Sequence, residues 1–240
     1  MFGSGLVVVL VAVDGPPDVL SDTSFSAHMV QHLLLQMVAA PLLVLGAPLS
    51  VVLRADPPWL RRRLLTRLLR TDAVRVLTHP VTTLGAFLVV LIGTHLTPLY
   101  EVALEHERVH QVEHLVYLVT AVLFWWTAIG VDPAPHRLSY PARLLHLFLA
   151  MPGTAFLGVA IANAGKVMYP HYAANPPRWD WTPLHDQAVA GTLMWVSGMF
   201  TIVPALAFLL LKWLEDDDHR QARLDGRRSL TASASDPRSP

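Results

Sequence analysis

Hydrophobic residues gather in long blocks that are separated by shorter polar segments. About 20 apolar residues are needed to cross the roughly 30 Å of hydrocarbon in a bilayer. Five blocks meet this length, at residues 25–53, 79–99, 108–130, 143–165 and 185–212. The pattern predicts an all-α integral membrane protein, a polytopic helical bundle of five full spans.

The two ends of the chain differ from these blocks. Residues 1–13 are apolar but short for a complete crossing, and they lack the basic start and cleavage site of a signal peptide. We therefore expect a truncated N-terminal membrane helix at 1–13 and a polytopic membrane domain at 14–214. Residues 215–240 begin with acidic residues and end in Ser, Arg and Pro, which favours a disordered cytoplasmic tail.

Two segments carry local signals that modify the simple pattern. Pro41, Gly46 and Pro48 predict that the helix of the first full span kinks and ends near Leu53. Leu and Arg alternate at helical spacing over residues 59–77, which favours an amphipathic helix on the cytoplasmic interface. A solvated basic connector is the alternative for that segment.

Composition and charge agree with a membrane protein and add an orientation. The chain is 53% hydrophobic and 15% charged, whereas soluble domains carry about 25% charged residues. Most of its 18 Lys and Arg residues follow the first, third and fifth of the full spans. The positive-inside rule then places both termini in the cytoplasm of a multi-pass protein of the bacterial cell membrane. Membrane lipid accounts for the basic loops, so no nucleic-acid partner is expected.

The candidate chemistry lies in the histidines. Seven of the 12 are predicted near the outer ends of the spans: His28, His32, His95, His106, His110, His114 and His185. Three pairs among them are four residues apart, and such residues share a helix face from which both imidazoles can reach one ion. Histidine is costly in hydrocarbon, so this layer predicts a metal or haem site. The chain has no cysteine, which excludes thiolate ligands.

Three neighbouring groups have more than one interpretation. Glu113 is placed to orient an adjacent imidazole. A thioether from Met29 would favour Cu(I), although packing explains a single methionine equally well. Asp186 either ligates the ion or interacts with a helix dipole. No role is expected for His79, His136, His146 or His219, which fall on the cytoplasmic side.

Other site classes also remain open at this point. Residues 106–110 read His-Glu-Arg-Val-His, which fits the H-E-x-x-H signature of zinc proteases, but a protease needs a third ligand and a wet cleft. One histidine from each of two helices would supply both axial ligands of a haem. A transporter would require more polar residues at the membrane centre than these spans contain.

Several motifs together resemble one known family. The sequence at residues 26–32, Ser-Ala-His-Met-Val-Gln-His, is followed by Ala-Pro-Leu-Leu-Val-Leu-Gly-Ala-Pro at 40–48. Thr-His-Leu-Thr-Pro-Leu-Tyr at 94–100, Glu113-His114, Phe-Trp-Trp at 124–126, Ala-Met-Pro at 150–152, and Tyr-Pro-His-Tyr at 169–172 extend the match. These motifs are similar to those of the CtaG family, polytopic bacterial assembly factors for caa-type cytochrome c oxidase. The resemblance covers about residues 25–212.

The resemblance implies a non-enzymatic role in making active oxidase, with copper supply as the usual proposal. Its motifs match His28, His95, His110 and His114. Family members usually have a fuller N-terminal helix and lack Glu at position 107, so the H-E-x-x-H match is expected to be incidental. We therefore expect copper at the histidine layer, with zinc or haem as alternatives. Cytochrome c oxidase subunits are the expected partners, with other copper chaperones as further ones.

Overall fold

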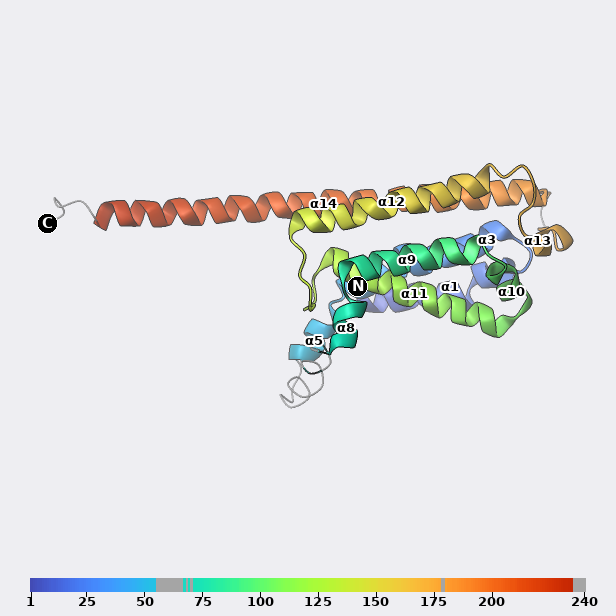
Figure 1. The fold of residues 1–240 in the computed structure, drawn as a ribbon, viewed down its shortest axis with the longest axis horizontal. Helices are drawn as coiled ribbons and strands as arrows, with labels where there is room; N and C mark the ends of the chain where they lie inside the picture. Colours follow the sequence, from blue (N-terminus) through green and yellow to red (C-terminus); the bar gives the residue numbers. More distant parts are fainter. Residues whose placement is uncertain (55–66, 68, 70, 178–179, 235–240) are drawn as a thin grey trace.

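The protein is described by a computed structural model that covers residues 1–54, 67, 69, 71–177 and 180–234. All regular structure within those residues is helical (Figure 1). The first half of the chain forms α1 Phe2–Asp14, α2 Pro16–Ser21, α3 Phe25–Leu33, the π-helix η1 Leu34–Ala39, α4 Ala40–Leu45 and α5 Pro48–Arg54. The second half forms α8 Asp72–Leu77, α9 Pro80–His95, α10 Leu99–Glu105, α11 Glu107–Ile129, α12 Tyr140–Ala162, α13 Pro170–Ala174 and α14 Pro183–Ala234.

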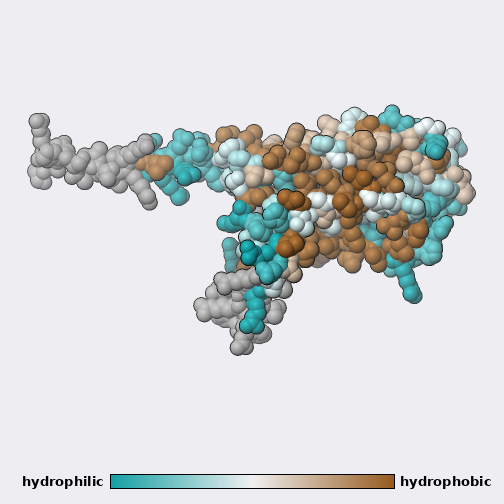
Figure 2. Space-filling model, viewed as in Figure 1, coloured by the Kyte–Doolittle hydropathy of each residue, from teal (hydrophilic) through white to brown (hydrophobic). Residues whose placement is uncertain are grey.

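The structure confirms an all-α polytopic membrane protein. Among the described residues, five helical stretches are long and apolar enough to cross a bilayer. They are Phe2–Ser21, Phe25–Arg54, Glu107–Ile129, Tyr140–Ala162 and Pro183–Asp225. Hydrophobic side chains cover the middle of the visible face of the bundle, and polar ones gather toward its ends (Figure 2).

These five stretches are not the five spans that the sequence predicts. Pro16 and Pro17 start α2 in its first turn, where a missing N–H is harmless, so the apolar N-terminal block continues to Ser21 and reaches 20 residues. The expected span at 79–99 instead ends as α9 at His95, and α10 follows at an angle of 69°. Pro98, which disfavours helical geometry in the residue before it, lies in this bend.

The helices run between two distinct ends of the bundle. Figure 1 shows the start of α1 and the far end of α14 on the side that carries α5 and α8, whereas α10 and α13 lie at the opposite end. We call the end with α10 and α13 the outer end, following the orientation predicted from charge. Six passages through the bundle, with α9 and α10 counted as one bent pair, bring the two termini to the same side.

The kink predicted at Pro41 takes the form of a π-helix. Ala40 donates its N–H to the carbonyl of Leu35, five residues back. The same register would pair the Gln36 carbonyl with residue 41, but proline has no N–H to donate. The indole Nε1 of Trp125 donates to that carbonyl instead, at 2.9 Å. A side chain of α11 thus satisfies the backbone group that Pro41 leaves free.

The ends of the expected domains also differ from prediction. α14 continues as a helix to Ala234, although the sequence from 215 onward predicts disorder. Its residues from Lys212 to Asp225 are exposed, so local helix propensity rather than packing accounts for this extension. The amphipathic helix expected at 59–77 falls mostly outside the described residues, and its last part is α8.

Close packing of α12 against α14 anchors the second half of the bundle. A Cβ built on Gly191 would lie 2.4 Å from the backbone nitrogen of Ala162, and one on Gly158 would lie 2.7 Å from the Gly191 carbonyl oxygen. The absence of side chains at both positions lets the two backbones touch. This contact holds α12 and α14 together in the outer half of the bundle.

Candidate metal centre

The outer start of α3 is held by a buried carboxylate from α14. Ser24 caps the helix by accepting a hydrogen bond from the Ala27 N–H. Asp186 accepts from the Phe25 N–H at 2.6 Å and from the hydroxyls of Ser24 and Ser26 at 3.1 and 2.5 Å. A carboxylate at a helix N-terminus also interacts favourably with the helix dipole. Asp186 therefore serves the dipole of α3, and its oxygens are engaged there rather than at a metal.

Four imidazoles from α3 and α11 form a closed group directly below this start. The ring centroids of neighbouring members are 4.4 Å apart for His28 and His32, 5.2 Å for His32 and His114, 4.1 Å for His114 and His110, and 4.7 Å for His110 and His28. Each pair within one helix has the four-residue spacing that aligns side chains on one face. The two pairs predicted from the sequence thus face each other across the interface of α3 and α11.

Ligand atoms in this group lie at distances close to those of a metal site. The Nε2 atoms of His28 and His32 are 3.0 Å apart and share a hydrogen bond. Two ligands about 2.1 Å from a tetrahedral ion lie roughly 3.4 Å from each other. Donor atoms of His28, His32, His110 and Glu113 all lie within 4.8 Å of one another. A contraction of up to about 1.4 Å by side-chain rotation would bring the widest pair to tetrahedral spacing.

The fifth imidazole is that of His95, the last residue of α9. Its ring centroid lies 6.4 Å from that of His32. The Nδ1 atom lies 2.8 Å from the carbonyl oxygen of Leu91, which can only accept, so Nδ1 carries the proton. The Nε2 atom then keeps its lone pair, and it is buried without a partner. This tautomer leaves Nε2 able to bind a metal ion.

Tyr172 fixes the tautomer of His28 in the same way. The Tyr172 hydroxyl donates to the Ser21 carbonyl at 3.0 Å and lies 3.1 Å from Nδ1 of His28. Because a hydroxyl has one proton, the ring must donate in the second bond. Burial raises the pKa of Tyr172 well above its usual value, which keeps the hydroxyl protonated. His28 therefore presents the lone pair of Nε2 to the group.

Buried polar atoms without partners concentrate in this group. They include Nε2 of His95, His110 and His114, Nδ1 of His32, and both carboxylate oxygens of Glu113. Each such atom ordinarily costs about 1–3 kcal/mol when it is buried and unpaired. A bound cation would satisfy several of them at once, because lone pairs repel one another but all attract a positive ion.

Some residues of the group are not foreseen as participants. Glu113 is predicted to orient a ligand, whereas its carboxylate lies among the ligand atoms themselves. Tyr100 and Tyr117 are fully buried, and their ring centroids lie 5.2 Å from His28 and 4.6 Å from His32. Tyr117 follows His114 by three residues on the same face of α11, a spacing that would have indicated it.

Two predicted ligands lie outside the group. His106 is exposed at the start of α11, where it makes no side-chain cap. His185 is exposed at the start of α14 and packs against Trp181. Both residues come before the buried part of their helices. They therefore lie near the outer end without facing the buried imidazoles. Met29 is also not a ligand here, because it packs in the apolar cluster with Phe25 and Tyr100.

The position of His106 bears on the H-E-x-x-H motif. Glu107 is exposed and accepts a hydrogen bond from Gln111 at 2.6 Å. Because His106 is exposed outside the buried group, the two histidines of the motif do not converge on one ion in this structure.

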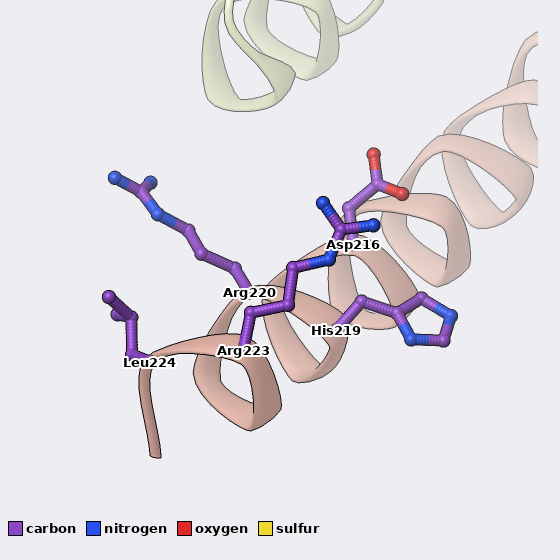
Figure 3. Close-up of a pocket in the computed structure, with 5 residues that line it drawn as sticks. All are labelled: Asp216, His219, Arg220, Arg223 and Leu224. Carbon is purple, nitrogen blue, oxygen red and sulfur yellow. The ribbon is translucent and has the colours of Figure 1, made fainter. Parts of the chain in front are cut away.

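A hollow of about 460 Å³ lies along the extension of α14, away from the buried histidine group. Figure 3 shows that its lining residues, among them Asp216, His219 and Arg220, all come from one helix and splay outward. Asp216 accepts a hydrogen bond from the Tyr140 hydroxyl at 2.6 Å. Two arginines beside a histidine repel a cation, so this hollow carries no metal site.

One known family matches most of the chain, including the residues of the buried group. Residues 1–216 match the family Caa3_CtaG, described as cytochrome c oxidase caa3 assembly factor. The chain belongs to this family. The match covers every helix of the bundle from α1 and includes all members of the histidine group.

Similar curated proteins come from mycobacteria. An uncharacterized protein of Mycobacterium tuberculosis is 32% identical over 211 residues, which cover 84% of this chain and 32% of that protein. An uncharacterized protein of Mycobacterium leprae is 31% identical over 221 residues, or 88% of this chain and 33% of that protein. The chain spans about a third of the length of these relatives. No solved structure matches it significantly.

Proposed function

We propose that this chain is a membrane-embedded, non-enzymatic assembly factor that binds a copper ion through His28, His32, His95, His110, His114 and Glu113 and assists its delivery to cytochrome c oxidase. The single observation that carries the proposal is the group itself. Five imidazoles and one carboxylate from three helices converge at the outer end, and most of their free atoms are buried without partners. Membership in a family of oxidase assembly factors supplies the biological context.

Copper fits the chemistry of these donors. Imidazole is a good ligand for copper and zinc, and among divalent first-row metals copper binds a given nitrogen and oxygen site most strongly. More donors are present than one ion needs. A surplus of this kind supports exchange, since one imidazole can leave the ion while another takes its place.

A haem is a poorer fit to the same residues. Bis-histidine ligation requires two imidazoles on opposite sides of a flat macrocycle. The four rings of α3 and α11 instead pack against one another, with neighbouring centroids 4.1–5.2 Å apart. No slot for a porphyrin separates them, so the packing supports a compact ion.

The position of the group supports delivery on the extracytoplasmic side. The positive-inside rule assigns the outer end to that side. His110 and His114 are each 8% exposed, whereas His28 is fully buried. His28 would therefore hold the ion from the inside of the bundle. A partner would reach the ion from the side of His110 and His114.

The copper content of the full chain, purified in detergent, tests binding. We expect about one copper per chain and a loss of at least tenfold in the variant His28→Ala/His32→Ala, since both imidazoles that α3 contributes to the group disappear. The matched control is His106→Ala/His185→Ala, which removes two exposed histidines and should leave the copper content unchanged. Helicity and elution volume confirm that each variant is folded. Equal copper in the two double variants would contradict the proposal.

Oxidase activity tests delivery separately. Membranes of a bacterium that lacks this chain should show low cytochrome c oxidase activity, restored by the native chain and by the control variant. The variant without His28 and His32 should not restore it at limiting copper. Full restoration by that variant would show that binding and assembly are unrelated.

A further inference from the structure

A cavity of about 430 Å³ opens beside the histidine group. It lies between the end of α1, the start of α2 and the outer half of α11. Its polar lining consists of Asp14, Asp18, Glu107, Gln111, His110 and His114, and aliphatic side chains complete the wall. The cavity thus has carboxylates at its rim and imidazoles deeper inside.

The two imidazoles connect this cavity to the candidate metal centre. His110 and His114 line the cavity, and both belong to the four-membered ring group with His28 and His32. The Nε2 atoms of His110 and His114 are buried and have no hydrogen-bond partner. Two unpaired acceptors more than nine-tenths buried therefore form the floor of an acidic cavity.

The carboxylates of the rim keep their negative charge free for a cation. Asp18 accepts a hydrogen bond from Nε2 of Gln31 at 2.7 Å, and Glu107 accepts one from Gln111, but amides bring no positive charge. Over the described part of the chain, the ion pair found is that of Arg75 and Asp72, at the other end. Glu107 comes three residues before His110, so the two side chains lie on the same face of α11 beside the cavity.

We propose that this cavity is the entrance through which the metal cation reaches the histidine group. The inference rests on the proposed function and adds a route to it. Asp14 and Glu107 are exposed and would attract a hydrated cation, Asp18 would receive it nearer the wall, and His110 and His114 would then take it up. Clefts lined by charge of one sign raise the association rate of an oppositely charged ligand by about 10- to 1,000-fold. The rim carboxylates set the rate of loading, and the buried imidazoles set the affinity.

The rate of copper uptake by the metal-free full chain in a non-ionic detergent tests the entrance. Aqueous Cu²⁺ is mixed rapidly with the protein, and loading is followed by competition with a chromophoric chelator. We expect Asp14→Asn/Glu107→Gln to slow loading about tenfold and to weaken its dependence on salt, while the final stoichiometry stays unchanged. The matched control, Glu105→Gln/Asp180→Asn, removes two other exposed outer carboxylates and should load at the native rate.

The outcomes separate this inference from the proposed function. If both double variants load at the native rate to full stoichiometry, the entrance is wrong and the binding group stands. If both slow equally, the effect is one of overall charge and the cavity has no special part. If the native chain takes up no copper, the proposed function fails and the entrance fails with it.

Discussion

Histidines lie at both ends of this bundle, and the two sets differ in what their nitrogen atoms do. At the inner end, His79 accepts a hydrogen bond from the Val81 N–H through Nδ1, and His136 donates from Nε2 to the Arg75 carbonyl. At the outer end, Nδ1 of His32 and Nε2 of His95, His110 and His114 are buried without a partner. Residue type and helical spacing therefore do not identify a ligand. Burial together with unpaired, converging nitrogen atoms distinguishes the outer set as the candidate ligands.

His146 makes the comparison sharper. It is buried near the inner end, and its Nε2 also has no hydrogen-bond partner. Its ring stacks on Phe124 with centroids 4.8 Å apart, and no other imidazole or carboxylate joins it in the described contacts. One unpaired nitrogen without neighbours of its kind cannot hold an ion. The two ends therefore differ in whether several buried imidazoles lie close together, not in whether a histidine is buried.

The largest effect is expected from Asp186→Ala. Loss of the carboxylate leaves the Phe25 N–H and the hydroxyls of Ser24 and Ser26 without their acceptor. We expect a loss of about 3 kcal/mol in unfolding free energy, together with weaker copper binding, because α3 loses its outer anchor. Thermal unfolding and chelator competition in detergent measure the two effects.

Asp132→Ala is the matched control for that variant. Asp132 is buried and accepts from the N–H groups of Leu49 and Ser50 at the inner start of α5. Its removal should lower stability by about 1–2 kcal/mol while copper affinity stays native. Equal effects of the two variants on copper affinity would mean that the outer end has no special relation to the ion.

His95→Ala compared with His146→Ala tests the role of convergence. Each variant removes one buried imidazole with an unpaired Nε2. We expect His95→Ala to weaken copper binding by about 10- to 100-fold and His146→Ala to leave it unchanged. A chelator-competition titration at fixed pH gives both affinities. A loss caused by His146→Ala would remove the distinction between the two ends.

Tyr172→Phe tests whether the tautomer of His28 matters. The variant removes the acceptor for Nδ1–H of His28 and leaves the ring in place. We expect copper affinity to fall about tenfold, as is typical when a partner that orients a ligand is lost. Tyr140→Phe, which removes the bond to Asp216 at the inner end, is the control and should bind copper normally.

The smallest effect is expected from His136→Ala. Its ring is half-buried, packs against His79 with centroids 5.1 Å apart and donates to one carbonyl. We expect a change in unfolding free energy within about 0.5 kcal/mol and no change in copper content. Loss of copper in this variant would indicate a second site at the inner end.

The sequence predicted the parts that depend on local spacing. Apolar blocks gave the fold class, and the four-residue spacing gave the two facing pairs of imidazoles, since both follow from helix geometry. His106 and His185 were misplaced because a residue at the start of a helix can point outward even when it lies at the right depth. The ligand position of Glu113 depends on how α3 and α11 pack, which no single segment encodes.

Helix continuity was the harder feature to predict. Pro16 and Pro17 look like a stop but begin a new helical turn, so the N-terminal block extends to Ser21. The bend between α9 and α10 needs the tertiary contacts that hold Tyr100 beside His28 and His95. Composition also suggested disorder from residue 215 onward, whereas α14 continues as a helix to Ala234. The polarity of a segment indicates whether it packs against the bundle, but it does not determine whether the segment is helical.

The π-helix between α3 and α4 determines the direction in which His28 and His32 face. One residue added to an α-helix turns everything beyond it by about 100° around the axis. The extra residue in Leu34–Ala39 therefore acts as an angular offset between the Pro41 anchor and the imidazoles of α3. A one-residue deletion in this stretch would keep every donor in the chain and yet rotate one pair away from the other.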